Sequence, residues 1–161
     1  MHKKIFFYSL FIIFLFNCEK DDICLEGTPG TPRLIIRFFD QNEKFTTKPL
    51  SNASIKALNE EEEYIVFSGD SLAIPLKLVS NTTIYTFTLL DDSANQEKVD
   101  TLKFNYKRED YYINRACGFL SNLIFTNPAL EILDKESVFS GFNVLKDTIK
   151  NEKQAHLAIY H

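Results

Sequence analysis

Apolar and polar residues alternate with a period of two along several short stretches, which predicts β-strands with one buried face. The alternation is clearest over residues 72–78, 84–90 and 99–106, and an apolar run at 33–40 adds a fourth strand. Pro75 interrupts the first of these stretches. Because proline has no N–H to donate to a strand ladder, we expect that strand at the edge of a sheet.

Weaker alternation predicts further strands at 53–58, 63–67, 111–115, 119–126, 144–149 and 156–160. Polar, turn-forming stretches separate the candidates, among them "SGD", "DDSANQ" and "TNP". Many short strands at this spacing predict an all-β fold, an antiparallel β-sandwich that is immunoglobulin-like or related to that type.

The first 17 residues have a different pattern. A short basic start with Lys3 and Lys4 precedes an almost unbroken apolar run over residues 5–16. This run is shorter than the roughly 20 residues that a membrane-spanning helix needs. It also lacks the polar face of a helix that docks on a folded domain, so we interpret residues 1–17 as a signal peptide.

The end of this leader resembles the lipobox of bacterial lipoproteins. In "LFNC", Leu15 stands three positions before Cys18, although Phe16 and Asn17 depart from the usual small residues. The resemblance implies acyl chains on Cys18, and more than one chain because a single chain anchors only marginally. The alternative is that Cys18 is a further disulfide cysteine. With lipidation, the chain divides into a signal peptide (1–17), an acylated tether (18–32) and a sandwich domain (33–161).

The remaining cysteines form an even number. If Cys18 carries lipid, then Cys24 and Cys117 are left, and export to an oxidising compartment predicts a disulfide between them. The alternative is two unpaired thiols.

The charge of the chain bears on its partners. The precursor has a net charge of −4, and its leader holds two lysines and no acidic residue. The mature chain therefore has 16 basic and 22 acidic side chains, or a charge of −6. We expect no nucleic-acid partner, because binding to phosphates requires basic surface.

Candidates for catalysis are few. His2 lies in the leader and His161 is the last residue. His156 alternates with apolar neighbours, so we expect it on the outer face of a sheet. Two cysteines, Cys24 and Cys117, without a nearby histidine do not suggest a metal site. We therefore predict a non-enzymatic protein without metal or cofactor, and a hydrolase based on paired carboxylates is kept as an alternative.

Aromatic residues suggest a possible binding surface. Tyr111 and Tyr112, with Phe104 and Tyr106 just before them, could stack on a sugar or a peptide. Core packing and cross-strand pairing account for them equally well.

Asp followed by Ser or Thr and then an apolar residue occurs four times and resembles an O-glycosylation sequon of exported Bacteroidota proteins. It marks Ser71, Ser93, Thr101 and Thr148 as candidate modification sites. Ordinary turn-to-strand chemistry is the alternative.

Four stretches together resemble a family of small Bacteroidota lipoproteins of unknown function: "CEKDDIC", "TPRLIIRFFD", "LAIPL" and "YYINRACGF". The family implies no activity. In this chain, the acidic run after Cys18, from Glu19 to Asp22, resembles a signal for export to the cell surface. The resemblance implies a lipid-anchored outer-membrane protein, at the surface rather than on the periplasmic leaflet. Its expected partners are the membrane, through Cys18, and an unidentified envelope protein, with a glycan or nutrient as the alternative ligand.

Overall fold

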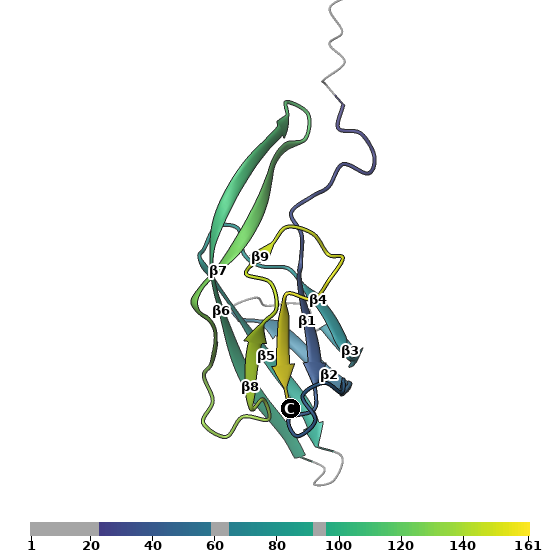
Figure 1. Ribbon diagram of the computed structural model, residues 1–161, viewed down its shortest axis with the longest axis vertical. Coiled ribbons are helices and arrows are strands. Elements are labelled where there is room, and N and C mark those ends of the chain that lie inside the picture. The colour runs from purple at the N-terminus through teal and green to yellow at the C-terminus, as the bar shows by residue number, and fades with distance from the viewer. Residues whose placement is uncertain (1–22, 59–64, 92–95) are drawn as a thin grey trace, which may run out of the picture.

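The computed structural model describes residues 23–58, 65–91 and 96–161, which form two β-sheets packed face to face (Figure 1). These ranges contain strands and loops but no helix. None of the described residues thus forms a helix that is long and apolar enough to cross a membrane. The predicted all-β sandwich is confirmed.

The smaller sheet has four strands. Their order is β4 (Ser71–Ile74), β1 (Leu34–Phe39), β10 (Leu157–Tyr160) and β8 (Gly141–Val144). β1 and β10 run parallel, with Ile36 beside Leu157, whereas the other pairs in this sheet are antiparallel. The expectation of an antiparallel sandwich is therefore wrong at this one pair. A parallel pair needs a long crossover connection, and here all six strands of the second sheet lie between the two strands in sequence.

The larger sheet has six strands. Their order is β3 (Ile65–Gly69), β2 (Leu50–Ala57), β5 (Thr82–Asp91), β6 (Gln96–Asn114), β7 (Gly118–Ile132) and β9 (Thr148–Ile149). β5 pairs with β6 only as far as Asn105, while β6 and β7 stay paired up to Asn114 and Gly118. Beyond the short contact of β7 with β9 at Leu123 and Ile124, residues 109–122 extend past the sandwich as a two-stranded hairpin, which we call the projecting ribbon (Figure 1).

The core lies between the inner faces of the two sheets. The alternation predicted for β5 and β6 is confirmed, because Phe87 and Phe104 are fully buried and their sequence neighbours are not. Phe139, from the loop after β7, also enters the core, and its ring centroid lies 5.5 Å from that of Phe87 and 6.2 Å from that of Phe38. Burial of each such side chain contributes about 2–3 kcal/mol.

A buried carboxylate holds the loop that carries Phe139. Asp100 Oδ2 accepts hydrogen bonds from Ser137 Oγ and from the backbone N–H of Val138, both at 2.8 Å, and of Phe139 at 3.3 Å. Three donors compensate for the loss of water around this charge. The loop is thereby fixed against β6.

Two predicted boundaries differ from the structure. β4 is an edge strand, as Pro75 predicts, but it ends at Ile74, and Leu78 is exposed. The "TNP" stretch is not a turn between strands. It lies inside β7, where the register shifts between the pairs Phe104–Leu130 and Tyr106–Phe125. Residues 126–129 therefore bulge out of the ladder, which tolerates a proline there.

The prediction for His156 is wrong. Its side chain is 1% exposed, and its Nδ1 accepts the backbone N–H of Ile35 at 3.1 Å. The neutral ring therefore carries its hydrogen on Nε2. Alternation with apolar residues did not reveal that His156 is buried, because side chains on both faces of β10, and His156 just before it, are all covered.

Burial lowers the pKa of His156. In the unfolded chain the ring protonates near its ordinary pKa of about 6.5, so below that pH the unfolded state binds more protons than the folded state. The free energy of unfolding should therefore fall as the pH drops below about 6.5. We expect His156→Gln, which cannot titrate, to show a shallower fall between pH 7.5 and 5.5 in denaturant unfolding.

Lys153→Gln, on the exposed loop before β10, is the matched control and should keep the slope of the parent protein. His161 is also buried and its pKa is also lowered by burial, so part of the slope remains in both variants. An unchanged slope in His156→Gln would contradict the assignment.

Candidate functional site

The tip of the projecting ribbon carries an exposed aromatic pair. Tyr112 on β6 is directly opposite Phe119 on β7, and their ring centroids lie 5.4 Å apart in an edge-to-face arrangement. The two residues are 59% and 66% exposed. The pair stabilises the hairpin end, but neither of the two described sheets covers it.

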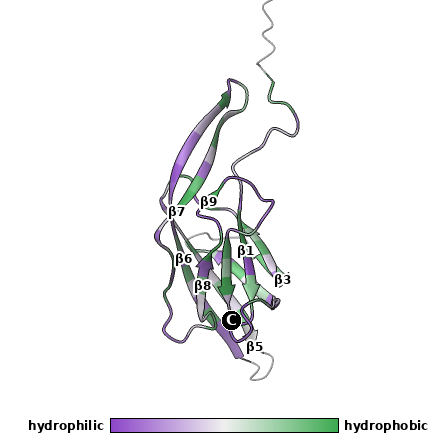
Figure 2. Ribbon diagram, in the orientation of Figure 1, coloured by the Kyte–Doolittle hydropathy of each residue, from purple (hydrophilic) through white to green (hydrophobic). Residues whose placement is uncertain are grey.

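A polar layer separates this pair from the core. On the same face of the ribbon, Asp110 Oδ1 accepts a hydrogen bond from Ser121 Oγ at 2.6 Å and lies 3.0 Å from Arg108 Nε. Figure 2 shows the hydrophilic stretch of β6 below the tip. The aromatic pair is therefore not an extension of the core.

The four aromatic residues singled out in the sequence separate into two groups. Phe104 and Tyr106 are buried, and the Tyr106 hydroxyl donates to the carbonyl of Lys77 at 2.7 Å. Tyr111 and Tyr112 are exposed, on opposite faces of the ribbon. Phe119 was missed as their companion. The short segment between Tyr112 and Phe119 was the signal that could have predicted this pairing, because a short turn places the two strands side by side.

A disulfide joins Cys24, in the segment before β1, to Cys117, in the turn of the ribbon. The two cysteines are 93 residues apart in sequence. This is the pair expected from the cysteine count. Farther along, Thr31 Oγ1 accepts the backbone N–H of Ser121 at 3.1 Å. The segment before β1 is therefore attached to the ribbon at two points and runs beside it (Figure 1).

An ion pair holds the start of β1. The guanidinium of Arg33 donates to both carboxylate oxygens of Glu152, at 3.0 and 2.6 Å, and the backbone N–H of Arg33 donates at 2.9 Å. These hydrogen bonds lower the pKa of Glu152 to about 2. The carboxylate thus stays charged and bonded at any physiological pH.

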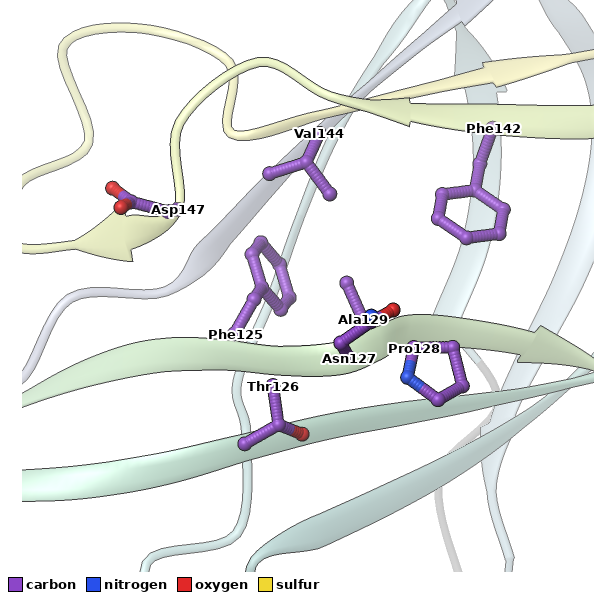
Figure 3. A pocket seen from close by; sticks show the side chains of 8 residues that line it. All are labelled: Phe125, Thr126, Asn127, Pro128, Ala129, Phe142, Val144 and Asp147. Carbon is purple, nitrogen blue, oxygen red and sulfur yellow. The ribbon is translucent and has the colours of Figure 1, made fainter.

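A shallow groove of about 320 Å³ lies between the β7 bulge and β8. Figure 3 shows Phe125 and Ala129 pointing from β7 toward Val144 and Phe142 on the other side. Asp147 stands at one end and supplies the carboxylate of this lining. The groove can accept a small, largely apolar group with one polar contact.

A model of a protein family described only as a family of unknown function (DUF6452) matches residues 51–161. The chain belongs to this family. The DUF6452 match includes the projecting ribbon, Cys117 and the groove, whereas β1 and Cys24 precede it. No match was found among the curated proteins or among the solved structures.

Membership of a family of unknown function is thereby confirmed, and the lipoprotein character stays a prediction. Cys18 and Ser93 lie outside the described residues. Of the other candidate modification sites, Ser71 is exposed on edge strand β4, while Thr101 and Thr148 in the larger sheet are half-buried. In the described ranges no group of three or more His, Cys, Asp or Glu is placed to hold a metal.

The disulfide generates a prediction. Chain entropy sets an upper limit of about 4–5 kcal/mol for closing a loop of this length. We expect the variant with Cys24→Ser and Cys117→Ser to lose less than this in free energy of unfolding. The reason is that the segment before β1 also gains freedom in the folded state. Denaturant unfolding of both proteins without reductant measures the loss.

Hydrogen exchange provides the local readout. The amide of Ser121 should lose protection in the double variant, whereas that of Phe104, in the core, should keep it. If both thiols of the parent protein react with an alkylating agent without reductant, the disulfide is absent in solution.

Proposed function

We propose that this protein is a lipid-anchored protein of the bacterial cell envelope, whose sandwich domain acts through protein contacts. The observation that carries the proposal is the Cys24–Cys117 disulfide. Disulfides persist in oxidising compartments outside the cytoplasm, which agrees with the leader and with the lipobox-like residues ending at Cys18. The acidic run of Glu19 to Asp22 favours the cell-surface side of the outer membrane.

Binding rather than catalysis suits the described side chains. The ring of His156 is buried and accepts a backbone hydrogen bond, and that of His161 lies 2.9 Å from the carbonyl of Lys48. Both histidines therefore support structure. A role as general base needs a ring within reach of a substrate, and neither position offers this.

The anchor is tested by changing the cysteine. Cys18→Ala should give a precursor that is not processed at this site and takes up no labelled palmitate, because the thiol that accepts the acyl chain is gone. Metabolic labelling of cells that produce the parent and variant proteins measures this. Cys24→Ser combined with Cys117→Ser is the control and should still be labelled.

Palmitate on the Cys18→Ala variant would contradict the anchor. An intact mass of the parent protein, taken from its native envelope, locates the mature N-terminus independently. The same intact mass tests for glycosylation. An added hexose mass that disappears in Ser71→Ala would assign the modification to Ser71, the exposed candidate.

A second candidate function is binding of a glycan or nutrient at the surface. The exposed Tyr112–Phe119 pair favours it, because an aromatic ring packs on the apolar face of a sugar. On this reading a glycan array should give hits that Phe119→Ser abolishes. Phe45→Ser is the matched control, since Phe45 is fully exposed and lies in the loop after β1. Equal binding by both variants would reject the tip as a glycan site.

A further inference from the structure

Exposed apolar side chains gather where three segments meet at the end of the ribbon. Tyr111 and Tyr112 come from β6 and Phe119 from β7, and Ile23 and Leu25 flank the cysteine that is joined to the turn. We call these five residues the aromatic tip. Tyr111 lies on the opposite face of the ribbon from Tyr112 and Phe119, so exposed apolar side chains occupy both faces of its end. Exposed apolar surface of this kind marks a contact with another apolar phase.

The residues that precede Ile23 indicate which apolar phase the tip contacts. Residues 1–22 lie outside the described structure and lead directly into Ile23. Cys18 is six positions before Cys24, so even a fully extended chain keeps it within roughly 20 Å of the disulfide. An acyl anchor on Cys18 therefore holds the tip next to the membrane.

The distribution of charge in the turn of the ribbon also fits a lipid surface. Between Tyr111 and Phe119, the sequence contains no carboxylate and one cation, Arg115. The carboxylates of the ribbon, Glu109 and Asp110, lie nearer the sandwich. The turn of the ribbon can thus approach lipid headgroups without taking an acidic group out of water. Asp22 and Glu26, which flank the Ile23–Leu25 segment, would have to stay at the hydrated side of the headgroups.

We propose that the aromatic tip docks into the headgroup region of the membrane that holds the acylated Cys18. This inference rests on the proposed lipid anchor and deepens it. Tyrosine and phenylalanine suit such a position, because aromatic rings accumulate at membrane interfaces. The tip presents too few apolar side chains to hold the protein by itself, so it acts as a second contact beside the acyl chains.

Docking of the tip would orient the whole domain. Figure 1 shows the loop between β1 and β2 at the end near the C-terminus, opposite the tip of the ribbon. Gln41 N–H in that loop donates to the carbonyl of His161 at 3.1 Å, which agrees with this placement. With the tip on the membrane, this opposite end points away from it and is free to meet a partner.

The chain lacks tryptophan, which permits a single fluorescent reporter. Phe119→Trp places the reporter in the tip, and Phe45→Trp places it in the opposite loop. The acylated mature variants are reconstituted into phosphatidylethanolamine vesicles with and without brominated acyl chains. Docking to the depth of about 5–10 Å typical of interfacial segments should quench about half of the Phe119→Trp emission and shift it to the blue.

The Phe45→Trp emission should be unaffected by brominated lipid. Equal and negligible quenching at both positions would overturn the docking proposal while leaving the anchor intact. A blue shift of Phe119→Trp that grows with protein concentration in vesicle-free detergent would assign the tip to a second copy of the chain instead. A blue shift caused by soluble oligosaccharide would assign it to a glycan.

A separate preparation keeps the two proposals distinguishable. The chain has three cysteines, and the disulfide uses two of them, so Cys18 without lipid is a free thiol. Coupling it to a maleimide phospholipid installs an anchor at the same position, whatever its natural modification. Quenching of Phe119→Trp there supports tip docking even if the native protein lacks acyl chains, and its absence rejects docking even if acyl chains are present.

Discussion

Burial of apolar side chains between the two sheets is the interaction on which the rest of this structure depends. Phe38 from β1, Phe87 from β5 and Phe139 from the loop after β7 meet in one core. The loop can deliver Phe139 only because the Asp100 carboxylate binds three donors along it. The parallel pairing of β1 with β10 places the first and the last strand of the chain side by side in the smaller sheet.

The projecting ribbon is the part that this core does not hold. Among the described residues, only β6 and β7 pair with each other over 109–122, and an isolated two-stranded hairpin is marginally stable in water. Here a disulfide at the tip, the Thr31–Ser121 hydrogen bond and the Asp110 cluster replace the missing core contacts. The chain thus maintains a structure away from its core, which is consistent with a role for the ribbon tip in binding.

Much of the architecture could be predicted from hydrophobic periodicity. Alternation located β5 and the first half of β6, because each has one face in the core and one in water. It stopped being informative at "KRED", where both faces of the ribbon are solvated and the pattern reads as a loop. The same limitation hid the continuity of β6, and the proline in "TNP" concealed that β7 passes through a bulge.

For the candidate site, local sequence identified Tyr111, Tyr112 and the two cysteines, but not how they are combined. Phe119 joins Tyr112 only through cross-strand pairing, and Phe104 and Tyr106 leave the group because the second sheet covers them. His156 was misplaced for the same reason, since its burial depends on packing around β10.

Local composition and spacing were enough to predict the strand-forming pattern, the even pair of cysteines and the leader that points to an anchor at Cys18. The folded chain was needed to show the parallel β1–β10 pair, the length of the ribbon and the position of Ile23 and Leu25 at the same end as the tip aromatics. These features arise from contacts between residues far apart in sequence, on which local periodicity carries no information.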